Sequence, residues 1–287
     1  GSSYQSDIDQ LIFLGTPHLG APDAYLIWEG GEFGQGFFNN GLKSIFTEEA
    51  LVNGYFTVFD YIRNKPIVSI QQLLPTYNYL KDKNLGFRNY PINYPTNQFL
   101  ENLNTNLATL TNSGVKLSNI VGENGTSSTL NFIRVDTTLF SIWEHGYPEG
   151  FFDGSTLDKG LELGMGDGTV SLTSAGFVGS DLVATTSSHT DLPTKAEGLV
   201  FSKLTGKTPT VLITKSLPER ILRIGEHSPA DIFVIAPDGK RIGKNFQTND
   251  EYNEIEGAFY SGFEGGEEFV TIPDPLDGEY KVEVQGT

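Results

Sequence analysis

In the first two thirds of the chain, short continuous apolar runs alternate with stretches of helical periodicity. The run LIFL at residues 11–14 passes directly into Gly15-Thr16-Pro17, which is the pattern of a buried strand that ends at a turn. The runs at 117–122 (LSNIVG) and 128–135 (STLNFIRV) predict two further strands. A buried strand needs neighbours on both sides, but only ten largely polar residues precede residues 11–14. We therefore ask what covers this first strand.

Helical spacing connects these strands. Apolar residues recur at helical intervals in three segments, 42–62, 68–80 and 97–110, and the second of these is expected to end at Pro75. Residues 137–166 show no period, and residues 181–206 predict a short strand, a polar loop and a helix that stops at Gly206. This order of strands and helices predicts an α/β domain over residues 1–207.

The pattern changes after residue 207. Short runs with period-two alternation lie at 210–215, 220–225, 230–237, 240–244, 269–273 and 279–285. Turn residues such as Pro237-Asp238-Gly239 separate them. We predict that residues 208–287 form a separate all-β sandwich of the immunoglobulin-like kind.

Charge and composition narrow the classes of partner. The formal net charge of −17 argues against electrostatic binding to nucleic acid or to anionic membranes. The chain has no cysteine, which excludes disulfides and cysteine-based metal sites. No H-x-H, H-x-x-x-H or calcium-loop pattern is present, so we expect neither a metal nor a cofactor. No apolar run is long enough for a transmembrane segment, and no signal peptide is recognisable.

Asp167 and His189 are the candidate catalytic residues. Asp167 lies in the turn GDG just before an apolar run, and His189 lies in the loop TTSSHTDLP before the last predicted helix. An acid followed by a histidine is the order in which an α/β-hydrolase supplies two members of its Ser-Asp-His triad. Spacing alone is a weak signal, because Asp-Gly is a common turn and a loop histidine is often merely solvated.

Five ordered blocks strengthen this interpretation: LIFLGTPHLGAPDAYLIWEGGE, SIQQLLPTYNYL, NQFLENLN, GDGTVSLTSA and SHTDLPTKA. Together they resemble the lecithin:cholesterol acyltransferase-like family of α/β-hydrolases, close to bacterial lipases. The resemblance implies the C-terminal part of an α/β-hydrolase fold with a helical cap insertion at about 25–112, in which Asp167 and His189 match the triad acid and histidine. It also implies a multidomain bacterial protein with a sandwich after the hydrolase, which places it outside the cell or on its surface.

The nucleophile of that family is absent from this chain. No serine has glycine at both −2 and +2, and the strand that precedes the family's nucleophile turn is missing too. Ser171, Ser174, Ser187 and Ser188 lie near the acid and the histidine in sequence, but none sits at a strand-to-helix turn. We interpret Ser187 and Ser188 as partners of local backbone groups. His18, in the Thr-Pro-His turn, is interpreted as a packing residue near the rim of the site.

The sequence leaves two functions open. In the first, the chain is part of a serine hydrolase, a lipase, esterase or acyltransferase, that acts on esters or lipids and receives its serine from a complementing N-terminal segment. The aromatic-rich stretch 25–61, with Gly30, Gly31, Gly34 and Gly36, then forms a cap over an acyl pocket as well as a packed subdomain. In the second, the chain is a non-catalytic extracellular binding or structural module that works through its sandwich.

Overall fold

A computed structural model describes residues 7–34, 37–65, 67–83, 85–137, 142–179, 181–212, 220–226, 230–262 and 268–286. The chain divides into two compact units, Gly1–Lys215 and Ser216–Thr287. The sequence predicts this boundary eight residues earlier, between residues 207 and 208. Within the described residues, no helix is long and apolar enough to cross a membrane.

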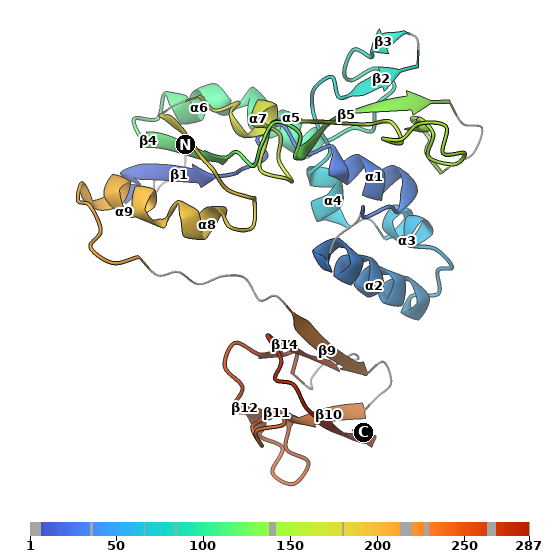
Figure 1. The fold of residues 1–287 in the computed structure, drawn as a ribbon, viewed down its shortest axis with the longest axis vertical. Helices are drawn as coiled ribbons and strands as arrows, with labels where there is room; N and C mark the ends of the chain where they lie inside the picture. The colour runs from blue at the N-terminus through green and yellow to red at the C-terminus, as the bar shows by residue number, and fades with distance from the viewer. Residues whose placement is uncertain are drawn as a thin grey trace. The chain divides into compact units, whose positions relative to one another are not determined.

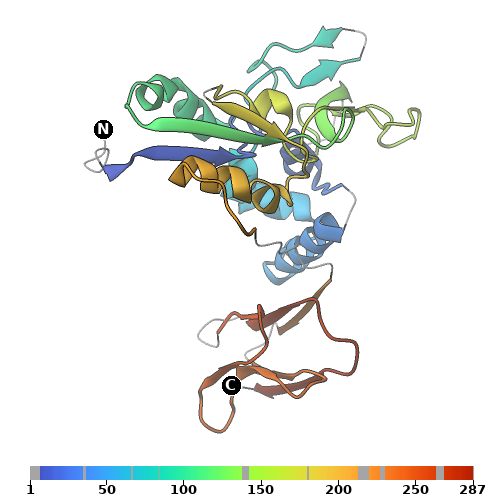
Figure 2. The ribbon, with the colours of Figure 1, turned by 60° about the vertical axis from the view of Figure 1, so that its left-hand side comes forward.

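The first unit contains a parallel sheet of three strands in the order β1-β4-β8. The strands are β1 (Gln10–Leu14), β4 (Lys116–Gly122) and β8 (Leu182–Thr185). One face is covered by α5 (Gln98–Thr105) and α6 (Leu107–Thr111), and the other by α8 (Leu192–Lys195) and α9 (Glu197–Thr205) (Figures 1 and 2). This three-layer arrangement confirms the predicted strands at 11–14 and 117–122 and the helix that ends at Gly206.

The central strand β4 shows why its sequence is almost continuously apolar. Ile120, which is fully buried, packs against Leu192 and Ala196 on the α8–α9 face. Its neighbour Val121 packs against Val170 and Ala175 on the opposite face. A parallel strand that is buried on both faces reads as an unbroken hydrophobic run.

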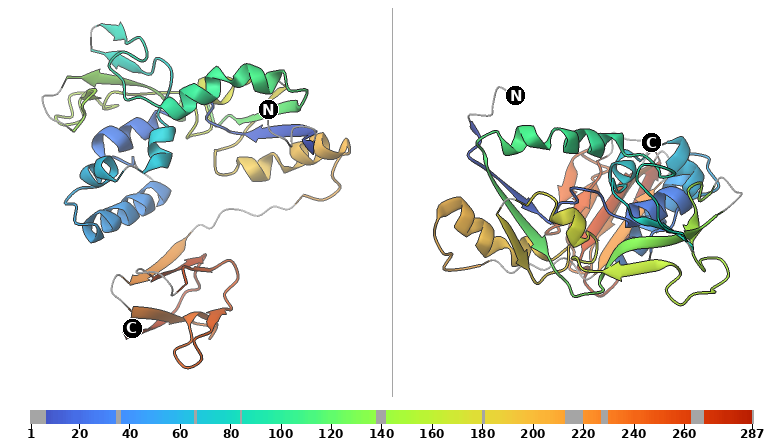
Figure 3. Two further views of the ribbon diagram at one scale, coloured as in Figure 1. Left: turned by 180° about the vertical axis from the view of Figure 1, so that it is seen from behind. Right: turned by 90° about the horizontal axis from the view of Figure 1, so that it is seen from above.

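A second sheet of the same unit contains parallel and antiparallel pairs. Its strands are β2 (Leu80–Asp82), β3 (Gly86–Phe87), β5 (Thr129–Asp136), β6 (Tyr147–Pro148) and β7 (Leu161–Gly164). The remaining helices are α1 (Asp23–Gly30), α2 (Phe37–Val52), α3 (Val58–Asn64), α4 (Val68–Gln72) and α7 (Leu172–Ala175). The view from behind shows this sheet and α1–α4 forming one half of the unit, beside the three-layer half (Figure 3).

Several predicted elements of the first unit are wrong. The helix expected to begin at residue 68 and end at Pro75 stops at Gln72, and Leu80, the last apolar residue of that segment, begins β2, where it pairs with Ile133 of β5. The helix expected over 97–110 is divided at Asn106, and the stretch 137–166, expected to be irregular, contains β6 and β7. The mixed α/β class is confirmed, but β5 belongs to the second sheet and not to the first.

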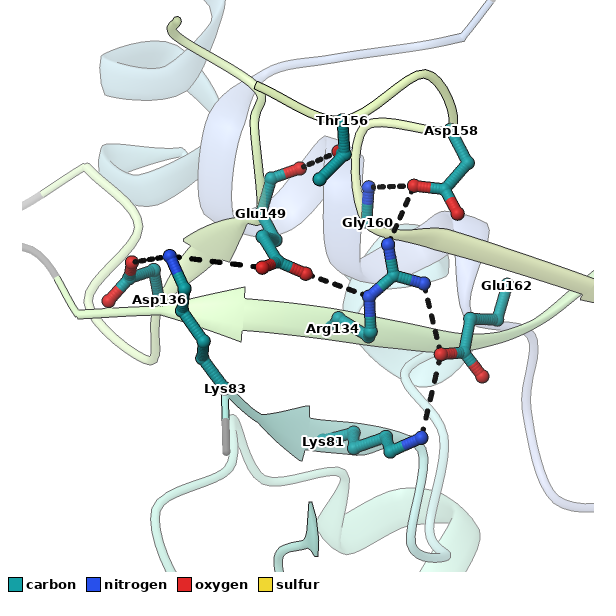
Figure 4. Close-up of polar contacts among 9 residues, drawn as sticks. All are labelled: Lys81, Lys83, Arg134, Asp136, Glu149, Thr156, Asp158, Gly160 and Glu162. Atoms are coloured by element: carbon teal, nitrogen blue, oxygen red, sulfur yellow. Dashed lines mark hydrogen bonds and ion pairs between the residues drawn. The ribbon is translucent and has the colours of Figure 1, made fainter. Parts of the chain in front are cut away.

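Salt bridges fix the irregular stretch 149–162 on β5 (Figure 4). The guanidinium of Arg134 contacts the carboxylates of Glu149 at 2.8 Å, Asp158 at 2.7 Å and Glu162 at 3.0 Å. These three contacts, with Asp158 contributing most, raise the pKa of Arg134 and balance its positive charge.

The second unit consists of two antiparallel sheets, β12-β11-β10-β15 and β13-β14-β9. The strands are β9 (Ile221–Glu226), β10 (Ala230–Ile235), β11 (Arg241–Lys244), β12 (Glu251–Asn253), β13 (Phe259–Tyr260), β14 (Glu268–Pro273) and β15 (Lys281–Gly286). The two sheets enclose one core that includes Ile232, Val234, Ile242, Val270 and Ile272, which is the sandwich-like packing that the alternation predicts.

One of the predicted sandwich strands is not observed. Val211 and Leu212, in the run at 210–215, are exposed and outside any strand, and residues 213–215 lie outside the described residues.

Candidate functional site

The candidate site lies at the carboxyl edge of the parallel sheet, where β1, β4 and β8 all end. A Cβ placed on Gly122, the last residue of β4, would lie 2.7 Å from the Cβ of Asp167. A Cβ placed on Gly15, directly after β1, would lie 3.1 Å from Oδ2 of Asp167 and 3.3 Å from Nδ1 of His189. The ends of β1 and β4 therefore approach Asp167 and His189 so closely that only glycine fits at positions 15 and 122. In parallel α/β sheets, ligands bind at this edge.

Asp167 is held by its own turn. Gly166 and Ser171 form a backbone bridge, and within this turn Oδ1 of Asp167 accepts hydrogen bonds from Thr169 N at 3.0 Å and Val170 N at 2.7 Å. The carboxyl group is 1% exposed. These two bonds orient the carboxylate and leave Oδ2 for another partner.

That partner is His189. Its Nδ1 lies 2.8 Å from Oδ2 of Asp167, and its backbone N–H donates to the carbonyl oxygen of Asp167 at 2.7 Å. With Nδ1–H donated to the carboxylate, Nε2 carries the lone pair and can act as a base. The side chain is 36% exposed, and Nε2 has no hydrogen-bond partner within the described part of the chain. The structure thus brings together the two residues that the sequence singled out.

The nearby serines have structural partners. The side chain of Ser171 caps the N-terminus of α7, and Oγ of Ser174 accepts from Leu19 N at 3.0 Å. Ser187 donates to the carbonyl of Ser188, and Ser188 donates to the carboxylate of Asp191, as expected for residues that satisfy local polar groups. None of the described serines hydrogen-bonds to His189.

His18 is a packing residue, as predicted. Its ring meets Phe13 edge-on at 4.7 Å between centroids, and its carbonyl accepts from Asn104 Nδ2 at 2.8 Å. Burial lowers its pKa, so the neutral form is favoured. His18 and Phe13 line a mainly apolar groove of about 530 Å³ between β1 and the helices α5 and α6, together with Leu103 and Leu107.

The aromatic stretch after β1 is in large part core. Trp28 and Phe33 are buried, whereas Phe56 is almost fully exposed. The neighbouring glycines are required by packing and backbone conformation: a Cβ on Gly30 would overlap the ring of Trp143, and Gly31 adopts a left-handed conformation as the C-cap of α1. Gly36 lies outside the described residues. The structure therefore shows this stretch as a packed subdomain.

Sequence reasoning missed the two glycines that lie against the pair, and it missed Asp23, a carboxyl group of the same unit with a raised pKa. Gly15 and Gly122 could have been found, because each glycine directly follows or ends an apolar strand and such positions allow close approach. Asp23 had no such signal: it lies half-buried in the first turn of α1, and burial raises its pKa to about 6. Asp23 also acts electrostatically on Tyr77, whose hydroxyl lies 3.4 Å from Oγ of Ser171.

Comparisons with known proteins return nothing for this chain: no family model matches it, and neither a curated protein nor a solved structure is significantly similar. Among the described residues, no group of three or more histidine, aspartate or glutamate side chains could hold a metal ion.

Proposed function

We propose that Asp167 and His189 are the acid and the general base of a serine-hydrolase triad that acts on esters or lipids. The contact that carries the proposal is the 2.8 Å hydrogen bond between Nδ1 of His189 and Oδ2 of Asp167 at the carboxyl edge of a parallel sheet. The carboxylate is buried, the imidazole side chain is 36% exposed, and its Nε2 has no hydrogen-bond partner among the described residues, which is the arrangement a catalytic base needs.

Each residue has a defined task in this reaction. A serine hydroxyl attacks the ester carbonyl while Nε2 of His189 accepts its proton, and the resulting imidazolium is stabilised by the carboxylate of Asp167. His189 then protonates the leaving alcohol, and the acyl-serine is released to water or to a second alcohol. Asp167 orients and stabilises the histidine and takes no proton from the serine itself.

We further propose that the serine comes from a complementing segment that pairs with β1. Among the described strands, β1 pairs only with β4, so its other edge is open. The connection from β1 to β4 carries α5 and α6. The added strand would lie on the far side of β1 from β4, so the step from it to β1 runs in the same direction across the sheet as the step from β1 to β4. If both connections have the usual right-handed crossover, the helix of the added connection lies on the same face as α5 and α6.

The groove lies on that face. It runs beside β1 between Phe13 and Leu103 of α5, and its lining contains no charged side chain. An amphipathic helix would cover it, and the turn between the added strand and this helix would lie at the carboxyl edge of the sheet beside His189.

The first test uses the 287-residue chain as it is. We expect no hydrolysis of p-nitrophenyl esters and no labelling by a fluorophosphonate probe, because no described serine contacts His189. Stoichiometric labelling of this chain would contradict the proposal that its nucleophile comes from another segment.

The second test is complementation. The coding sequence on the 5′ side of residue 1 should encode an apolar strand followed by G-x-S-x-G, and the form that includes it should be labelled and hydrolyse the ester. Serine→Ala in that motif, His189→Ala and Asp167→Asn should each abolish turnover. Absence of such a segment, or activity that persists in His189→Ala, would refute the proposed function.

A further inference from the structure

The sandwich unit holds a second group of buried ionisable side chains, and the hydrolase proposal does not involve it. Nζ of Lys244, at the end of β11, lies 2.6 Å from Oδ2 of Asp231 in β10. The two side chains are 14% and 5% exposed. Glu268, at the start of β14 in the opposite sheet, is 4% exposed and hydrogen-bonds to the Asp231 carboxyl.

The cluster contains two carboxyl groups and one ammonium in a place with little water. Oε2 of Glu268 accepts hydrogen bonds from Tyr260 Oη at 2.7 Å and from Ile232 N at 2.9 Å. Burial raises the pKa of Glu268, and the nearby Asp231 adds to the rise. Glu268 therefore holds a proton more readily than an exposed carboxylate would.

The backbone brings the lysine to the aspartate. Gly243, directly before Lys244, has φ +115°, and a Cβ at this position would lie 2.3 Å from the carbonyl oxygen of Ile232. Only glycine allows this approach of β11 to β10. The lysine nitrogen then touches one carboxyl oxygen of Asp231, and the carboxyl carbon lies one covalent bond further on.

We propose that Lys244 and Asp231 are joined by an intramolecular amide bond, with Glu268 as the proton carrier for its formation. Two features distinguish this cluster from an ordinary salt bridge. The ion pair is enclosed, so its desolvation is expensive, and replacing it with a neutral amide removes that cost. A third ionisable group, Glu268, is placed against the reacting carboxyl where it can give and take a proton.

The reaction is a condensation and needs no oxidant or reductant. In the apolar surroundings a proton moves from Nζ to the carboxylate of Asp231, which leaves a neutral amine and a neutral carboxylic acid. The nitrogen lone pair attacks Cγ, Glu268 removes a proton from the nitrogen and returns one to the leaving hydroxyl, and the C–O bond breaks. One Nζ–Cγ bond forms, one water leaves, and Glu268 ends as it began. Fixed contact between the reactants supplies a high effective concentration.

The direct test is the mass of the denatured full-length chain. We expect it to be lower than the sequence mass by one water. Trypsin should fail to cleave after Lys244, so that the peptide 224–240 remains attached to the peptide 242–281 in one branched product. A chain of full sequence mass that is cleaved after Lys244 would refute the proposal.

Variants assign the lost water to these residues. Lys244→Arg keeps a cation beside Asp231 but cannot form this amide, so the chain should regain the full sequence mass; circular dichroism checks that it is folded. Glu268→Gln should likewise prevent the mass loss or slow it by orders of magnitude. Lys240→Arg is the matched control, because Lys240 lies 3.3 Å from Asp238 in an exposed pair that should not react. A mass loss that persists in Lys244→Arg would place the dehydration elsewhere and refute the bond.

Discussion

Two buried carboxylates in the first unit each contact a histidine, and the contrast between them indicates which one is suited to catalysis. Nδ1 of His189 lies 2.8 Å from Asp167, and Nδ1 of His145 lies 3.0 Å from Glu29. Both carboxylates are almost completely inaccessible, at 1% and 0% exposure. On distance and burial of the acid alone, the two pairs cannot be told apart.

Their other partners differ. Glu29 also accepts hydrogen bonds from Arg63 Nη2 at 2.8 Å and from the backbone N–H of His145 at 3.0 Å, and the guanidinium of Arg63 stacks on Trp28. Arg63 therefore already balances the charge of Glu29, and His145 is one of several groups that fasten a loop to α1. Among the residues that the structure describes, no lysine or arginine contacts Asp167, and its histidine is twice as exposed as His145, at 36% against 17%. The more exposed imidazole, and a carboxylate that no described lysine or arginine contacts, are the features that favour the Asp167–His189 pair for proton transfer.

The largest expected effect separates the pairs by activity. In a form of the protein that contains the complementing serine segment, His189→Ala or Asp167→Asn should lower kcat/KM by at least about a thousandfold, because the base or its tautomer is lost. His145→Ala, corrected for the folded fraction, should leave kcat/KM nearly unchanged. Ester hydrolysis, normalised to the concentration of active sites, measures kcat/KM in each variant. Equal losses in His189→Ala and His145→Ala would contradict the assignment of catalysis to the Asp167–His189 pair.

For the free energy of unfolding, the order of the two pairs should be the reverse of the order for activity. Glu29→Ala leaves Arg63 without its buried partner and should lower the free energy of unfolding by about 3 kcal/mol. Asp167→Ala removes an acceptor of two backbone N–H groups and should cost about 1–2 kcal/mol. Both tryptophans, Trp28 and Trp143, are buried in the first unit, so their fluorescence during urea unfolding reports on that unit alone.

Glu144→Ala is the control for this measurement. Glu144 lies 3.7 Å from Arg63 but is 65% exposed, so its removal should change stability by less than about 0.5 kcal/mol. If Asp167→Ala proved more destabilising than Glu29→Ala, the structural role assigned to the Glu29 pair would be wrong.

The two pairs also differ in how far the sequence could predict them. Asp167 and His189 each lie in a polar loop at the end of an element, and an acid followed by a histidine is the order that singles them out in the sequence. Glu29 and His145 are 116 residues apart, inside a helix and an irregular stretch, and no local pattern connects them. The contact depends on Trp143, whose ring fills the space beside Gly30, and such packing is decided by the assembled fold.

The same limit explains the errors in the fold. The runs at 11–14 and 117–122 were predictable because strands buried on both faces are apolar throughout. The pairs formed by Leu80 with Ile133 and by Val135 with Pro148 involve strands of two or three residues, which are too short to show a period. Leu80 lies beyond Pro75, where the helix is expected to end, and no strand is predicted there because only its long-range pairing with β5 defines it.

Asp23, a half-buried carboxyl of the same unit, extends the comparison to a group that no described lysine, arginine or histidine contacts. Asp23 has a folded-state pKa of about 6, raised by burial from its ordinary value of 3.8. Folding therefore favours the protonated form: Asp23 costs nothing below about pH 4, and the cost grows as the pH rises to about 6 and then stays constant. Asp23→Asn should stabilise the first unit by about 1–3 kcal/mol at pH 7.5 and by close to zero at pH 4.

The control is Asp9→Asn, because the Asp9 side chain is 82% exposed and should behave alike at both pH values. Urea unfolding at pH 4 and pH 7.5, followed by tryptophan fluorescence, measures the difference. A stabilisation of the Asp23 variant that is the same at the two pH values would show that its cause is packing and not titration.

The smallest effect concerns the backbone that supports the Asp167–His189 pair. Gly15 has φ +55°, and a Cβ there would lie 2.8 Å from Cδ2 of Leu192 as well as close to both members of the pair. Gly206 has φ +69° and open space around the same position. Gly206→Ala therefore measures backbone strain alone, about 1 kcal/mol, and Gly15→Ala should cost about 1 kcal/mol more because Leu192 must move. Equal losses of stability in the two variants would mean that Leu192 and the pair move aside at no cost in free energy, and that Gly15 does not hold the pair in place.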